Sequence, residues 1–142
     1  MVSDRWFGLS ALMLVITLTC NAEEPRFPLR LYGLDYPRIA IQAGLRGTVI
    51  LRCALRGDGT VRSATYVSGP IALADAASAN ALKWKFRQPN GKDDGELMMI
   101  YRFELRETVD GLDSKSEFVF ESPNVITVYA DRLRVMPVAS DK

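Results

Sequence analysis

Histidine is absent from this chain of 142 residues. Its absence excludes Ser-His-Asp and Cys-His catalysis, imidazole ligands for a metal ion, and a histidine-based pH switch. Neither sign of charge is in excess, because 18 basic side chains balance 17 acidic ones. A net charge of +1 gives no electrostatic signature of a protein that binds nucleic acid or an anionic membrane surface.

Long hydrophobic runs are also scarce, and the longest uncharged one extends over residues 6–20. A bilayer-spanning helix needs about 20 apolar residues, whereas the apolar part of a secretory signal has about 7–15. Cys20-Asn21-Ala22 places small residues where signal peptidase reads them, and Pro25 interrupts a continuing helix. We therefore predict a signal peptide over residues 1–22, cleaved after Ala22. An uncleaved membrane anchor and a lipoprotein are the alternatives.

Cysteine is rare, and cleavage after Ala22 would leave Cys53 as the single cysteine of the mature chain. An exported protein enters an oxidising compartment, but one cysteine cannot form an intramolecular disulfide. Residues 47–56 alternate in hydrophobicity, which indicates a half-buried strand with Cys53 on its apolar side. The pattern favours a buried thiol over an exposed one that cross-links two chains.

A β-hairpin and a helix follow from the patterns in the middle of the chain. Gly57-Asp58-Gly59 indicates a tight turn between strands over residues 47–56 and 60–68. Residues 71–86 are alanine-rich and predict a helix with one apolar stripe. The stripe comprises Leu73, Ala76, Ala77, Asn80, Ala81 and Trp84. Asn80 within it requires a hydrogen-bond partner or a place at its edge.

The flanking segments predict further elements. Residues 96–107 alternate as a long strand, and residues 118–120 and 125–129 are two β-prone pieces in the tail. Ahead of the hairpin, Tyr36-Pro37 opens a short helical turn that ends at Gly44. The apolar side of this turn comprises Ile39, Ala40 and Ala43.

Few groups of side chains suggest chemistry. Asp93-Asp94 is typical of a solvated loop, and Gly57-Asp58-Gly59 lacks the later ligands of a calcium loop. No phosphate-binding glycine-rich loop is present. Basic and aromatic residues interleave over residues 83–87, which the end of a helix explains better than contact with nucleic acid. We predict no enzyme, no cofactor, no metal site, no nucleic-acid partner and no small-molecule substrate.

The segment from Tyr36 to Leu105 resembles the C-terminal domain of TonB, the periplasmic energy transducer, and covers about half of the chain. The matching residues are Tyr36-Pro37, Ala40, Gly44 and Gly47 before the first strand, Asp58-Gly59 at the hairpin turn, Val67-Ser68-Gly69 at the end of the second strand, Ala76-Ala77 on the helix, and Trp84-Lys85-Phe86 with Pro89 at the end of the helix. One departure is Ala74, which stands where the family commonly has an acid, with Asp75 one position later.

The resemblance implies an α+β domain over residues 36–107, built as a two-layer β-β-α-β unit. Its sheet would have three antiparallel strands, with the helix packed on one face. Residues 23–35 would then be a short lead-in, and residues 108–142 a C-terminal extension with one or two strands. The resemblance also implies a location in the periplasm of a Gram-negative envelope after cleavage near Ala22, or in the inner membrane if the N-terminal segment is retained.

In the family, the domain captures an extended segment of outer-membrane receptors, which adds as a strand beside the third strand. The accepting edge implied for this chain comprises Leu97, Met98, Met99, Ile100, Tyr101, Arg102, Phe103, Glu104 and Leu105. Tyr36 and Pro37 are implied to line the site as well. The partner would be such a receptor segment or another envelope protein, and a homodimer stays open.

The tail suggests an alternative function. Strands within residues 108–142 would pair with the edge that accepts a receptor segment, which protects the edge from aggregation and also blocks the ligand. A complete transducer of the family further has a histidine-bearing membrane helix and a long spacer, so we expect no energy transduction by the family mechanism. The two hypotheses are a peptide-binding module of TonB-dependent transport and a non-transducing scaffold whose tail caps its own sheet.

Overall fold

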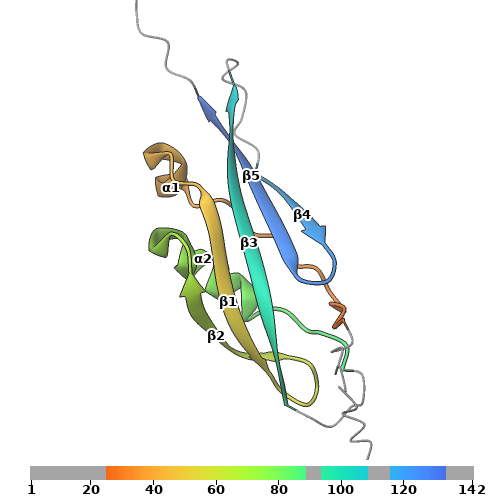
Figure 1. Cartoon of the computed structure of the whole chain (residues 1–142). Helices are drawn as coiled ribbons and strands as arrows, with labels where there is room; N and C mark the ends of the chain where they lie inside the picture. Colours follow the sequence, from red (N-terminus) through yellow and green to blue (C-terminus); the bar gives the residue numbers. More distant parts are fainter. Residues whose placement is uncertain (1–24, 89–93, 109–115, 134–142) are drawn as a thin grey trace, which may run out of the picture.

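Five strands form one mixed β-sheet, and two helices lie on one of its faces (Figure 1). The computed structural model describes residues 25–88, 94–108 and 116–133, so the predicted signal peptide lies outside the described residues. In chain order the elements are α1 (Arg38–Ala43), β1 (Gly47–Leu55), β2 (Val61–Ser68), α2 (Ile71–Ala81), β3 (Gly95–Thr108), β4 (Glu117–Glu121) and β5 (Val125–Leu133). The strand order is β2-β1-β3-β5-β4, and only the neighbours β3 and β5 run parallel.

The predicted α+β class is confirmed, but the predicted three-stranded antiparallel sheet is wrong. β4 and β5 enlarge the sheet to five strands, and β5 pairs parallel to β3 over nine residues. Alternating hydrophobicity identifies a strand but not its neighbour or its direction. Here the chain returns along β4 and then reverses over residues 122–124, so β5 fits between β4 and β3 in the direction of β3.

β1 and β2 form the predicted hairpin. In its turn the Gly59 N–H donates to the Arg56 carbonyl over 2.8 Å, and Asp58 accepts hydrogen bonds from the backbone and the hydroxyl of Thr60. The hydroxyl bond is the main reason why the pKa of the exposed Asp58 carboxyl lies below its usual range. β1 turns Cys53 into the core as a free thiol, which confirms the predicted burial.

α2 ends at Ala81, so the predicted helix over residues 71–86 is too long. The N–H groups of Lys83 and Trp84 close a turn onto the carbonyls of the last helical residues. Beyond that turn the chain becomes extended, because Lys85 bridges Thr60 and Phe86 bridges Pro28. Trp84 is nonetheless buried and stacks on Phe86 at 5.8 Å between ring centroids.

Asn80 satisfies all of its hydrogen-bonding groups inside the core. Its amide nitrogen donates to the carbonyls of Tyr32 and Gly33 over 3.2 and 2.8 Å. Its oxygen accepts from the Trp84 indole N–H and from the Tyr101 hydroxyl, each over 2.9 Å. The sequence required a partner for this residue, and the structure supplies four.

α1 ends at Ala43, so Gly44 lies just past its end, as predicted. The φ of Gly44 is 67°, a left-handed conformation that glycine adopts readily. Of the predicted apolar side of this helix, Ala40 alone is buried. Ile39 is 79% exposed, and Ala43 is exposed as well. A helix of six residues presents little more than one turn to the sheet, and here that turn presents Ala40.

The lead-in to α1 is packed against the rest of the domain. The Leu29 N–H donates to the Lys85 carbonyl and the Arg87 N–H to the Phe27 carbonyl, each over 2.8 Å. From there the segment passes behind β3 and β5 toward α1 (Figure 1). It therefore closes the core over the half of the sheet that α2 does not cover.

Candidate functional site

All nine residues of the predicted accepting edge lie in β3. Their side chains alternate between the two faces of the sheet. The odd-numbered ones face the helices, where Met99, Tyr101 and Phe103 are fully buried. The even-numbered ones face the open side, where Met98, Arg102 and Glu104 are exposed.

The backbone of β3 is paired on both sides over much of this stretch. β1 pairs with it antiparallel from Gly95 to Phe103. On the other side β5 pairs with it from Ile100 to Thr108, with Ile100 beside Val125 and Thr108 beside Leu133. The edge that the resemblance assigns to a receptor segment is therefore occupied from Ile100 onward by the chain itself.

A short part of β3 has no β5 beside it. Over Gly95–Met99 the strand pairs with β1 alone among the described strands. Asn124 marks the boundary, since its carbonyl accepts the Ile100 N–H over 3.0 Å and its amide group donates to the Met98 carbonyl. Because backbone groups alternate in direction along a strand, the N–H groups of Glu96 and Met98 point away from β1.

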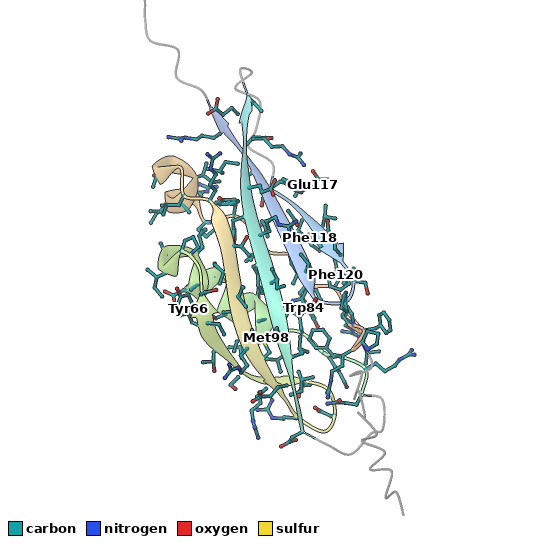
Figure 2. The ribbon with its side chains drawn as sticks, in the orientation of Figure 1. Tyr66, Trp84, Met98, Glu117, Phe118 and Phe120 are labelled. Atoms are coloured by element: carbon teal, nitrogen blue, oxygen red, sulfur yellow. The ribbon has the colours of Figure 1, made fainter. Side chains whose placement is uncertain are left out.

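The β4–β5 hairpin belongs to the same core as the helices. Ile126, Val128 and Ala130 of β5 are fully buried. From β4, Phe120 lies 5.6 Å from Trp84 between ring centroids (Figure 2). Sequence patterns indicated both tail strands but not this contact, because it joins residues that are far apart in the chain.

Tyr36 reaches the same part of β3 from beneath the sheet. Its ring meets Phe103 edge-on at 5.3 Å, its N–H donates to the Ser116 hydroxyl over 3.0 Å, and its hydroxyl donates to the Leu45 carbonyl. Burial raises the pKa of Tyr36 to about 12. Pro37 immediately precedes α1 and is half-buried. The structure therefore brings Tyr36 to β3 as a core residue, not as a wall of an open groove.

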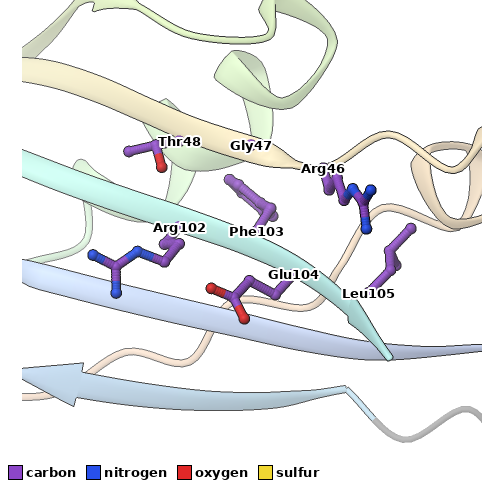
Figure 3. Close-up of a pocket in the computed structure, with 7 residues that line it drawn as sticks. All are labelled: Arg46, Gly47, Thr48, Arg102, Phe103, Glu104 and Leu105. Carbon is purple, nitrogen blue, oxygen red and sulfur yellow. The ribbon is translucent and has the colours of Figure 1, made fainter. Parts of the chain in front are cut away.

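A shallow hollow lies where β1 begins beside β3. It is lined by Arg46, Gly47, Thr48, Arg102, Phe103, Glu104 and Leu105. Both signs of charge border it, and Arg102 and Glu104 project from the same side of β3 (Figure 3). Because β3 is paired with β5 at these positions, the hollow offers side chains to a partner but no free backbone on that side.

β2 and β4 form the outer edges of the described sheet. β4 has five residues and carries Glu117 and Glu121 at its ends. If two copies paired antiparallel through β4 about Val119, Glu117 of each would oppose Glu121 of the other. Short strands with charged residues are a common protection of sheet edges against such pairing.

The described ranges contain neither a candidate metal site nor a helix that could span a membrane. Residues 25–88, 94–108 and 116–133 contain no group of three or more cysteine, aspartate or glutamate side chains placed to hold a metal ion. Within the same ranges, neither helix has the length and apolar character needed to cross a membrane.

Comparison with known proteins identifies one family. The profile of the family described as Gram-negative bacterial TonB protein C-terminal matches residues 32–105, just over half of the chain. The solution NMR structure of the Pseudomonas aeruginosa TonB C-terminal domain is similar over 59% of this chain and 90% of that chain, with 20% identity and a TM-score of 0.46. No curated protein matches the sequence. The chain therefore belongs to the family of the C-terminal domain of Gram-negative bacterial TonB proteins.

Proposed function

We propose that this protein is a self-capped scaffold of the cell envelope, in which β5 holds the β3 edge that relatives would offer to a receptor segment. The observation that carries the proposal is the nine-residue parallel pairing of β5 with β3, from Ile100 to Thr108. In β-strand addition the affinity comes from backbone hydrogen bonds along the edge of the accepting strand. From Ile100 to Thr108, β5 already occupies that edge of β3.

Family membership sets the context of this proposal. The family is a non-enzymatic transducer domain, and it implies a place in the cell envelope and contact with outer-membrane receptors in TonB-dependent transport. For this chain, contact with a receptor segment or another envelope protein is part of the proposal. A periplasmic location after cleavage near Ala22 is also part of the proposal.

The energetics favour a closed edge. An incoming strand on β3 would have to displace β5 and expose Ile126 and Val128, which are completely buried. Each such side chain contributes about 1.5–3 kcal/mol through burial. Since each 1.4 kcal/mol corresponds to a factor of ten in affinity, a receptor segment would bind at least about 100-fold more weakly than to an open edge.

Amide hydrogen exchange tests the capped edge without any ligand. The N–H groups of Arg102 and Glu104 point toward β5, whereas those of Tyr101 and Phe103 point toward β1. The first pair therefore reports on the capped edge, and the second pair is the control. We expect equally slow exchange on the two sides, because both ladders belong to one core. Exchange at Arg102 and Glu104 that is much faster than at Tyr101 and Phe103 would contradict the proposal.

A pair of variants separates loss of the cap from loss of stability. Ile126→Ala removes core packing that holds β5 beside β3. Leu73→Ala removes core packing of α2 and leaves β5 paired with β3. We expect Ile126→Ala to accelerate exchange selectively at Arg102 and Glu104, and Leu73→Ala to accelerate both sides equally. Titration with N-terminal segments of the host's outer-membrane receptors should shift β3 amide signals in Ile126→Ala only. Shifts of the same size in the unmodified protein would show an open edge.

The second candidate function is strand addition at the part of β3 that β5 leaves free. Glu96 and Met98 direct N–H groups away from β1, and Met98 is exposed on the open face (Figure 2). A partner there would extend the line of β5 past Asn124 and would leave the hairpin in place. In the same titration it would shift the amide signals of residues 95–99 and spare those of residues 102–108.

A further inference from the structure

We propose that the lead-in and the segment after α2 together form a surface that docks on an anionic phospholipid bilayer. The surface comprises the apolar side chains of Phe27, Leu29 and Leu31 and the basic side chains of Lys85 and Arg87. It is independent of the proposed cap on β3, because none of its members belongs to the sheet.

Backbone pairing fixes which way these side chains point. Pro28 is paired antiparallel with Phe86, and Phe86 is turned into the core against Trp84. Side chains alternate across an extended backbone, so the neighbours Phe27, Lys85 and Arg87 point outward when Phe86 points inward. Two hydrogen bonds of 2.8 Å hold this arrangement rigid.

The apolar members of the surface are three exposed side chains that lie close together in the chain. Phe27, Leu29 and Leu31 are 48%, 52% and 54% exposed within five residues of chain. Single exposed apolar residues are ordinary, whereas a contiguous group marks an interaction site.

Charge selects the membrane as the partner. Among the described residues of the two segments, Arg26, Arg30, Lys83, Lys85 and Arg87 are basic and Asp35 is acidic, and the carboxyl group of Asp58 lies close to Lys85. The overall net charge of +1 conceals this local excess of positive charge. Apolar side chains rimmed by lysine and arginine suit the boundary between acyl chains and anionic headgroups.

Position in the chain favours the same partner. The uncharged run over residues 6–20 ends seven residues before Phe27. Seven extended residues reach at most about 25 Å. If the run is retained in the inner membrane, as the anchored alternative has it, Phe27 can never be far from the bilayer surface. If the run is cleaved, the basic residues supply the attraction.

Paramagnetic broadening by a membrane tests the proposal. The full chain, as recovered from a Gram-negative host, is mixed with lipid nanodiscs that carry a headgroup nitroxide, made of phosphatidylcholine with or without phosphatidylglycerol. We expect broadening of the amide signals of residues 27–31 and 85–87 with phosphatidylglycerol, and sharp signals from β2. Uniform broadening of the domain, or none, would overturn the proposal.

Matched variants distinguish docking from mere tethering. F27S/L29S/L31S should abolish the selective broadening, whereas I39S/I71S, which removes two still more exposed apolar side chains on α1 and α2, should retain it. K85Q/R87Q leaves the apolar group in place, and it should weaken binding to phosphatidylglycerol discs about thirtyfold. Thermal unfolding establishes that each variant is folded. If F27S/L29S/L31S and K85Q/R87Q broaden as the unmodified chain does, the surface is not a membrane site.

Discussion

Asn80 joins more parts of the chain than any other side chain described above. It connects α2 to the lead-in, to Trp84 and to Tyr101 of β3 through four hydrogen bonds. An isolated asparagine in an apolar stripe would be destabilising, because a buried polar group without partners costs about 1–3 kcal/mol. Here the same residue fixes the lead-in against the helix.

Replacing Asn80 with alanine should therefore destabilise the fold. Asn80→Ala leaves the Trp84 indole and the Tyr101 hydroxyl buried without an acceptor, so we expect the free energy of unfolding to fall by about 2–4 kcal/mol. Urea unfolding followed by tryptophan fluorescence measures the change. Ser78→Ala, on the same helix, is the control and should change it by less than about 0.5 kcal/mol. An equally small change for Asn80→Ala would show that the network contributes nothing.

The hairpin turn carries a second prediction at the residue scale. Gly59 has a φ of 86°, and a Cβ atom there would lie 1.9 Å from the Phe86 carbonyl oxygen. Gly59→Ala thus combines an unfavourable backbone conformation with a clash against backbone, and we expect a loss of at least about 2 kcal/mol. Gly57→Ala, in the same turn without a positive φ, is the control. Equal thermal midpoints for the two variants would refute this reasoning.

At the scale of elements, pairing partners matter more than propensity. Residues 125–129 are β-prone in sequence and lie in the strand Val125–Leu133, yet the role proposed for this strand depends on its position beside β3. The end of α2 shows the same rule, since Lys85 and Phe86 leave the helical pattern to pair with Thr60 and Pro28. Local patterns indicated the elements, and contacts distant in sequence set their ends and neighbours.

At the scale of the whole molecule, one core extends under the entire sheet. It includes residues from the lead-in, both helices and β5. The residues matched by the family profile end at Leu105, so β4 and β5 lie beyond the matched part while sharing its core. The extension is for this reason a structural partner of the domain and not a detached tail.

Burial of ionisable groups in that core predicts how stability depends on pH. Burial raises the pKa of Cys53 and of Tyr36 to about 12, and it raises that of Tyr101 as well. Unfolded, Cys53 ionises near pH 9 and the tyrosines near pH 10. A raised pKa in the folded state stabilises the protein fully below those values, and this contribution is lost as the pH rises toward 12.

The free energy of unfolding should hence decline from about pH 9 upward, by about 1.4 kcal/mol per pH unit for each group that ionises only on unfolding. Urea unfolding at a series of alkaline pH values measures this decline. Cys53→Ala lowers the overall stability but should remove the part of the slope that begins near pH 9. A stability that stays constant up to pH 11 would contradict the burial of these groups.

Local patterns alone predicted the hairpin and the burial of Cys53, because neighbouring residues impose periodicity and turn chemistry on one another. The α+β class and the family were expected from the resemblance that the ordered motifs carry. The resemblance assigned the candidate edge to residues 97–105, all of which lie in β3. Only the tertiary structure decided that β5 occupies this edge from Ile100 onward and that Phe27, Leu29 and Leu31 are exposed beside Lys85 and Arg87. The physical reason is that strand pairing and exposure depend on which distant segments the common core brings together.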